Sequence, residues 1–195
     1  MQVKGLGIAL LSGCGALLVG LGLLGIAAQV SAQEADPITD NAMRMLEEGR
    51  QTFRYDTFGD EVFWGDTLQL HQAIAGEANG GVGPGVSPAL ALAVGLKVDM
   101  DALPPELVEQ VQAGQVDLED PATTLALLQL NAVVGVTGFF DDSGTLTSMG
   151  IQCSLCHSTV DDAFAPGIGH RLDGWANRVY AAFLWCVLGS AGLFA

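Results

Sequence analysis

Five consecutive residues towards the C-terminal end, Cys153-Ser154-Leu155-Cys156-His157, constrain this chain more than any other segment. Two cysteines three positions apart fit on one helical turn, so both thiols project from the same side. The adjacent histidine then carries its imidazole on that side as well. Such thiols can each add across a vinyl group of haem, and a neutral imidazole is a normal proximal ligand of haem iron. The segment therefore predicts one covalent haem c, held through Cys153 and Cys156, with His157 as the iron ligand.

Other uses of a C-x-x-C pair fit the sequence less well. A thiol–disulfide site normally lies at the start of a helix that follows a strand, and the helix-rich pattern here supplies no such unit. A structural zinc site needs four ligands, and the sequence has no second Cys/His pair at suitable spacing. The remaining cysteines, Cys14 and Cys186, do not make a disulfide framework. An accidental match, or a fragment that keeps the attachment residues without a complete pocket, stays as an alternative.

The N-terminal segment predicts export. Residues 1–32 have the order of a secretory signal peptide: Lys4, an apolar stretch from Gly5 to about Ala28, and small residues at Val30-Ser31-Ala32. The apolar stretch is long, so an uncleaved membrane anchor is the alternative. Since haem is attached to such motifs outside the bacterial cytoplasm, we expect a periplasmic protein. The expected organisation is a signal peptide at 1–32, a haem domain at 33–178 and an apolar tail at 179–195.

The charge balance favours some partners over others. The chain has 7 Lys and Arg against 22 Asp and Glu, a formal charge of −15, and removal of residues 1–32 takes away only Lys4, which leaves −16. An acidic surface repels nucleic acid and anionic membranes and attracts cationic proteins. We therefore expect a redox protein partner with a basic docking surface and no nucleic acid. Acidity that only keeps an exported protein soluble is the alternative.

The pattern of helix signals predicts a mainly α fold. A helix is expected from Thr39 or Asp40 to Phe53, and a short one at 67–75. Three more helices should begin where a capping residue precedes proline, at Ser87-Pro88, at Asp101 before Pro104-Pro105, and at Asp120-Pro121, with stops at Gly95, Gly114 and Gly135. Residues 139–147 predict a short β-hairpin that turns at Asp-Ser-Gly. The glycine-rich loop at 79–85 lacks the pattern of a phosphate-binding loop.

The segment after the motif, Ala165-Pro166-Gly167-Ile168-Gly169, resembles the Gly-Pro-x-Leu-x-Gly stretch of class I cytochromes c. The resemblance implies that the Pro166 carbonyl accepts a hydrogen bond from the His157 imidazole, although proline and glycine are exchanged here. Residues 49–53, Gly-Arg-Gln-Thr-Phe, look like the end of the first cytochrome c helix. A cytochrome c-like domain with a long insertion before the haem motif is the fold that this resemblance implies.

A second resemblance covers residues 49–178. The runs at 53–61, Phe-Arg-Tyr-Asp-Thr-Phe-Gly-Asp-Glu, and at 130–136, Leu-Asn-Ala-Val-Val-Gly-Val, are similar to the N-terminal part of long periplasmic dihaem cytochromes of the cytochrome c peroxidase-like group. Those relatives continue further and carry a second C-x-x-C-H, which this sequence lacks. The difference favours a truncated relative, although a buried terminal helix and a marginal membrane contact through the apolar residues 179–195 are alternatives.

The sixth iron ligand stays open at this stage. No methionine follows Met149, which lies too close to Cys153 to reach the distal face easily. His170 is expected at the surface or beside a ligand, with ligation of the iron, and hence bis-histidine coordination, as the alternative. His71 is expected in packing or in a hydrogen bond to a haem propionate. We expect a periplasmic electron-transfer cytochrome with no catalytic residue of its own. A haem peroxidase-like fragment, which a five-coordinate iron would favour, and a truncated relative without a working haem pocket are the alternatives.

Overall fold

A computed structural model describes residues 36–178 of the chain. The chain divides into two compact units, Met1–Leu46 and Glu47–Ala195. Helix α2, Pro37–Tyr55, begins in the first unit and ends in the second. The expected signal peptide at 1–32 and the apolar tail at 179–195 lie outside the described residues. Within residues 36–178, no helix is both long and apolar enough to cross a bilayer.

Helix α2 confirms the first predicted helix, but it starts earlier than expected. The backbone N–H of Ile38 and the hydroxyl of Thr39 donate to the Asp36 carboxylate at 3.2 and 3.0 Å. Asp36 therefore caps the helix in place of Thr39 or Asp40. The hydrogen bond from the Ile38 N–H is the main reason why the pKa of Asp36 lies below its ordinary value.

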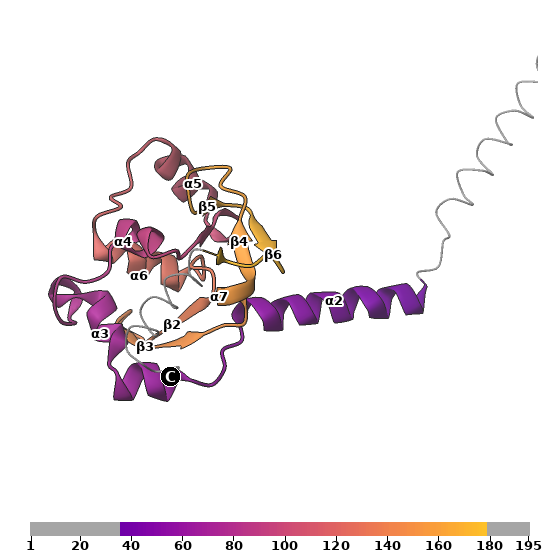
Figure 1. The fold of residues 1–195 in the computed structure, drawn as a ribbon, viewed down its shortest axis with the longest axis horizontal. Coiled ribbons are helices and arrows are strands. Elements are labelled where there is room, and N and C mark those ends of the chain that lie inside the picture. Colours follow the sequence, from indigo (N-terminus) through magenta and orange to yellow (C-terminus); the bar gives the residue numbers. More distant parts are fainter. Residues whose placement is uncertain (1–35, 179–195) are drawn as a thin grey trace, which may run out of the picture. The chain divides into compact units, whose positions relative to one another are not determined.

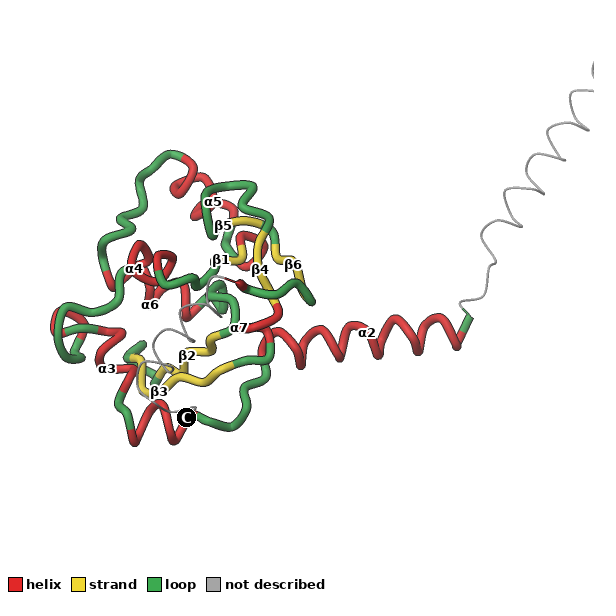
Figure 2. Tube along the Cα trace, viewed as in Figure 1, coloured by secondary structure: helices red, strands yellow, loops and turns green. Residues whose placement is uncertain are grey.

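The second unit consists of short elements joined by long loops (Figures 1 and 2). Its helices are η1 (Val62–Thr67, a π-helix), α3 (Leu70–Ala75), η2 (Glu77–Asn79), α4 (Pro88–Ala93), η3 (Met100–Ala102), α5 (Pro105–Gln112), α6 (Pro121–Gln129) and α7 (Ser154–His157). Its strands are β1 (Val98–Asp99), β2 (Val136–Phe140), β3 (Leu146–Ile151), β4 (Ser158–Val160), β5 (Ile168–Gly169) and β6 (Arg171–Asp173). The described residues thus mix helices with small sheets, and a mainly α, cytochrome c-like fold stays a prediction.

Two of the three predicted helix starts are capped as expected. The Ser87 side chain accepts from the Leu90 N–H before α4, and Asp120 accepts from the Ala122 N–H before α6. At the third start, Asp101 was the wrong cap. Helix α5 begins after Pro104 without a side-chain cap, and Asp99 accepts from the Asp101 N–H to begin the short η3 turn instead.

Two of the three predicted helix stops are likewise found where we expected them, and the third is not. Gly95 and Gly114 follow α4 and α5 with φ of 100° and 65°, which is the left-handed conformation that ends many helices. Helix α6 ends at Gln129, and the left-handed residue that follows it is Asn131, a non-glycine residue with φ of 52°. Gly135 therefore does not end α6; it also has a positive φ, of 90°, but its role lies in tertiary packing.

Three two-stranded sheets support the loops of the described residues. The predicted hairpin is confirmed as β2 and β3, which pair antiparallel with Val136 opposite Ile151. Its turn is held by the Asp141 carboxylate, which accepts from the backbone N–H groups of Ser143 and Thr145. Strand β1 pairs parallel with β5, and β4 pairs antiparallel with β6. The last pair directly follows the cysteine motif and fixes its C-terminal side.

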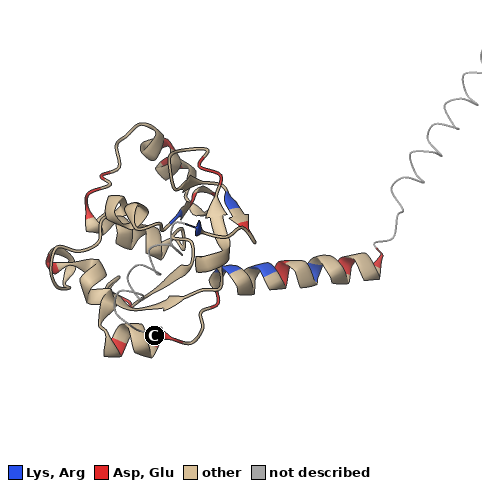
Figure 3. Cartoon of the chain, viewed as in Figure 1, with Lys and Arg blue, Asp and Glu red and all other residues tan. Residues whose placement is uncertain are grey.

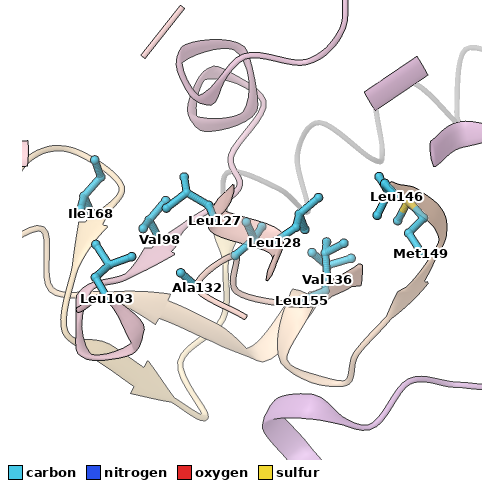
Figure 4. Packing of buried hydrophobic residues seen from close by; sticks show 11 residues of the cluster. Val98, Leu103, Leu127, Leu128, Ala132, Val136, Leu146, Met149, Leu155 and Ile168 are labelled. Atoms are coloured by element: carbon cyan, nitrogen blue, oxygen red, sulfur yellow. The ribbon is translucent and has the colours of Figure 1, made fainter. Parts of the chain in front are cut away.

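The hydrophobic core joins α6, the hairpin and α7 (Figure 4). Leu127 and Leu128 come from α6, Val136 from β2, and Leu155 from the turn that carries the cysteine motif. Gly135 allows this turn to approach, because a Cβ at this position would lie 2.3 Å from the Leu155 Cα. Glycine is thus required here by both the positive φ and the close contact.

We predict that Gly135→Ala lowers the free energy of unfolding by about 3 kcal/mol, since alanine combines a left-handed backbone with a clash against Leu155. Gly59→Ala is the matched control. Gly59 also has a positive φ, of 72°, but no atom lies within 4 Å of a Cβ there. The control should cost only about 1 kcal/mol, because it adds strain without a clash. Urea unfolding of both variants measures the difference, and equal losses would contradict the close-packing role of Gly135.

Candidate functional site

The helical turn α7 has two different faces. Cys153, Cys156 and His157 are exposed, whereas Ser154 and Leu155, which lie between them in sequence, are buried. Successive residues of a helix turn by about 100°, so the three exposed side chains share one face and the two buried ones the other. Both cysteines are free thiols. The structure therefore places the three predicted site residues together on one exposed face.

The inner face of the turn is fixed by a buried polar network. The Gln152 side chain, 2% exposed, accepts hydrogen bonds from the Ser154 hydroxyl and the Gly135 N–H, and its amide donates to the Thr137 hydroxyl at 2.8 Å. The Thr137 hydroxyl in turn donates to the carbonyl of Tyr55, at the end of α2. The network links the motif to β2 and to α2, so the orientation of the thiols does not depend on the turn alone.

A second segment fastens the C-terminal side of the turn. The backbone N–H groups of Gly174 and Asn177 donate to the carbonyls of His157 and Cys156 at 2.8 and 2.9 Å. The buried Asn177 side chain donates to the Gly95 carbonyl at 3.0 Å. The segment from 174 to 177 therefore runs along the motif. It also carries Trp175, a large apolar side chain that is 66% exposed to solvent.

Asp173 is the charged centre next to the motif. Its carboxylate accepts from the Ser158 hydroxyl at 2.8 Å and from Arg54 Nε at 2.6 Å. Partial burial would raise the pKa of Asp173, but the hydrogen bonds from Arg54 and Ser158 and the charge of Arg171 hold it below the ordinary value. Ser158 directly follows His157, so this ion pair connects the motif to the end of α2.

Arg171 completes the charge cluster but leaves donors unused. Its Nε lies 2.9 Å from Asp173 Oδ1, yet neither Nε nor Nη2 donates a hydrogen bond to any described residue, and the side chain is only 2% exposed. Burial lowers the pKa of Arg171 and raises that of the neighbouring Asp99. Figure 3 shows how few basic positions the described chain has, so two arginines at Asp173 form a local exception to the acidic composition.

Pro166 lies in a tight turn, and the hydrogen bond to His157 that the cytochrome c resemblance implies for its carbonyl stays a prediction. Ala165, Pro166, Gly167 and Ile168 fit a type II turn, in which Gly167 has φ of 83° and the Ile168 N–H donates to the Ala165 carbonyl at 2.8 Å. The turn leads into β5. Among the described residues, no hydrogen bond joins Pro166 to His157.

The other candidate iron ligands are not gathered at the motif. His170 lies at the surface, where its Nδ1 is 2.9 Å from Asp101 Oδ1, and this hydrogen bond raises the pKa of His170. Met149 is buried in the core. His71 lines a separate cavity of about 280 Å³, with its buried Nδ1 unpartnered. Within residues 36–178, no cluster of three His, Cys, Asp or Glu side chains is arranged to hold a metal ion.

A larger cavity lies elsewhere in the second unit. It has a volume of about 430 Å³, and its lining comes from α3, α4 and α6 and from the β2–β3 hairpin. Its wall is almost entirely apolar and includes Trp64, Ala91, Val136 and Met149. Neither the two motif cysteines nor His157 belongs to this wall. Sequence patterns did not indicate this cavity.

The comparisons with known proteins add no relative. No family model, no curated protein and no solved structure matches the chain. The resemblance to class I cytochromes c and to the dihaem peroxidase-like group therefore stays a prediction from the quoted motifs.

The residues at the motif fit covalent attachment of haem c. Attachment needs two free thiols on one side of a turn and an imidazole next to them, and Cys153, Cys156 and His157 have this arrangement. Haem bound in this way would be held by two thioether links and by the imidazole, and it would supply a one-electron iron couple. The supporting residues Gln152 and Asp173 could not be recognised from local sequence, since their partners are distant along the chain.

We predict that Asp173→Asn lowers the free energy of unfolding at pH 7 by about 2 kcal/mol, because it removes a charged acceptor of two hydrogen bonds. The pKa of Asp173 is depressed in the folded state, so its contribution is complete above the ordinary aspartate value of about 3.9 and is lost as the pH falls through the folded-state value. The difference between variant and wild type should therefore shrink below about pH 4.

Urea unfolding at a series of pH values between 7 and 3 tests this prediction. Asp142→Asn, which changes an exposed carboxylate in the hairpin turn, is the control and should alter stability by less than about 0.5 kcal/mol. A loss in Asp173→Asn that stays constant down to pH 3 would show that the carboxylate charge is not the source of the stabilisation.

Proposed function

We propose that this protein is an electron-transfer cytochrome with one haem c, attached through Cys153 and Cys156 and ligated by His157. The observation that supports it most directly is the division of α7 into a buried face and an exposed face with both free thiols and the imidazole. A turn that served only to pack the core would not need three reactive side chains on its solvent side. Export to the periplasm, as predicted from residues 1–32, provides the compartment for attachment.

The surrounding residues have supporting roles in this proposal. Gln152 and Leu155 hold the inner face of the turn. The hydrogen bonds that the segment 174–177 donates to the carbonyls of Cys156 and His157 hold its C-terminal side. The two thiols and the imidazole are therefore preorganised before haem arrives. The chain is strongly acidic. A redox protein with a basic docking surface is therefore the proposed partner, and its association should weaken as the ionic strength rises.

The direct test is expression of the full chain together with a c-type haem maturation system, followed by intact mass and a visible spectrum. We expect a mass increase of one haem that survives denaturation in acid. The double variant Cys153→Ala/Cys156→Ala should have no covalent haem, whereas Cys186→Ala should keep it. Folded wild-type protein without covalent haem would exclude the proposed function and leave a truncated relative or a dithiol protein.

A second variant tests the role of His157 separately from attachment. His157→Ala keeps both thiols, so it should still allow some covalent attachment but change the ferric spectrum, because the proximal nitrogen is lost. His170→Ala, at the surface ion pair with Asp101, is the control and should leave the spectrum unchanged. Identical spectra for His157→Ala and wild type would show that another residue ligates the iron. A five-coordinate wild-type spectrum together with peroxide turnover would favour the peroxidase-like alternative.

A further inference from the structure

We infer that the apolar tail of this chain, residues 179–195, docks into the cavity that α3, α4, α6 and the β2–β3 hairpin line. The contact is within one molecule. It does not rest on the proposed haem function, because neither the motif cysteines nor His157 belongs to the cavity wall. Three features of the molecule support this contact: the point at which the tail starts, its composition and the exposure of the wall.

The tail starts beside the cavity wall. Its neighbour in sequence, Arg178, follows Asn177. The buried Asn177 side chain donates to the Gly95 carbonyl at 3.0 Å, and the residues on either side of Gly95, Val94 and Leu96, both line the cavity. The backbone N–H of Asn177 is held as well, by a carbonyl of the cysteine motif at 2.9 Å. Tethering at such a point gives a segment an effective concentration on the order of millimolar at the wall, far above that of an unlinked partner.

The tail and the wall have matching chemistry. The tail, Val-Tyr-Ala-Ala-Phe-Leu-Trp-Cys-Val-Leu-Gly-Ser-Ala-Gly-Leu-Phe-Ala, has no charged residue and no histidine, in a chain that carries 22 Asp and Glu. The wall is almost entirely apolar, and Lys97 is its one charged member among the described residues. Contact between the two removes apolar surface from water on both sides and takes no charge of the tail out of water.

The wall is exposed enough to receive a segment of chain. Leu90 lines the cavity and is 49% exposed, and Leu70 and Ile74 on α3 are only partly buried. A volume of about 430 Å³ is about three times that of a cavity of about 150 Å³, which is large enough for one large apolar side chain. The cavity therefore accepts about three such side chains and not the whole tail. Phe183 and Leu184 are the first phenylalanine and leucine of the tail, so they are the residues that enter it.

A second copy of the chain and a membrane surface are the competing partners for the tail. Each chain has a formal charge of −15, so two copies repel each other, as do one copy and an anionic membrane. Docking within one molecule brings neither a second acidic chain nor a lipid headgroup near this surface. The charge of the chain thus favours its own cavity as the place where the tail is covered.

Photocrosslinking of the full chain tests the contact. Phe183 is replaced by benzoylphenylalanine, which forms covalent links to nearby C–H groups under ultraviolet light, and the linked residues are identified by peptide mass mapping. We expect links within one molecule to wall residues such as Ile74, Leu90 or Met149. The same links should form in Cys153→Ala/Cys156→Ala, which should lack haem, so failure of the proposed function would leave this test intact.

Two substitutions at half-exposed positions show whether the wall holds the tail. Leu90→Asp places a charge at the wall, and it should lower the yield of links and raise the rate of chymotrypsin cleavage within residues 179–195 by about tenfold, since an undocked tail is open to the protease. Val82→Asp is the matched control, because Val82 is 53% exposed and does not line the cavity. It should change neither quantity.

A change in the tail itself keeps the test valid if Leu90→Asp does not fold. Phe183→Asp/Leu184→Asp leaves the wall intact and should raise both chymotrypsin cleavage of the tail and the fluorescence of an added hydrophobic dye, which then enters the vacated cavity. Links that join two copies, links only to lipid when phosphatidylcholine–phosphatidylglycerol vesicles are present, or links outside the wall would overturn the inference. Equal cleavage of the tail in wild type and in both charged variants would overturn it as well.

Discussion

The packing of Leu155 against Gly135 is the contact on which the motif depends. Cys153, Cys156 and His157 can share an open face only because the opposite face of the same turn is held in the core. Leu155 supplies the apolar part of that anchor, and the Gln152 network supplies the polar part. A four-residue helical turn cannot maintain its own conformation in water, since helix nucleation is unfavourable. Tertiary contacts therefore determine the direction in which the thiols point.

The charge cluster at Asp173 has the same role on the other side of the motif. It joins α2 to β6 across 119 positions of sequence, through the hydrogen bond from Arg54 to Asp173. Such a pair gains little when it is fully exposed, but here both side chains are largely shielded from solvent, so the loss of one partner leaves a poorly solvated charge. Arg171 adds a further buried cation whose Nη2 has no acceptor among the described residues. The strands that flank His157 are thus fixed by charge as well as by backbone pairing.

The sequence predicted those features that depend on neighbouring residues. Ser87 and Asp120 cap helices because the capping side chain and the backbone N–H that donates to it are only two or three positions apart, and the Asp141 turn forms for the same reason. Predictions failed where two nearby residues offer the same capping group, or where the contact partner of a residue is distant in the sequence. Asp99 and Asp101 offer similar carboxylates two positions apart, and the tertiary structure uses the first. Gly135 has the character of a helix stop, yet its positive φ serves the contact with Leu155.

The proposed haem site and the apolar cavity beside α3, α4, α6 and the β2–β3 hairpin share one layer of side chains. Leu155 packs on the inner side of the motif, and Val136, a member of the same core cluster, also belongs to the cavity wall. Figure 4 shows these two side chains next to each other. Close-packed interiors transmit changes in volume to their neighbours, so the shape of the cavity and the orientation of the motif are constrained by the same residues.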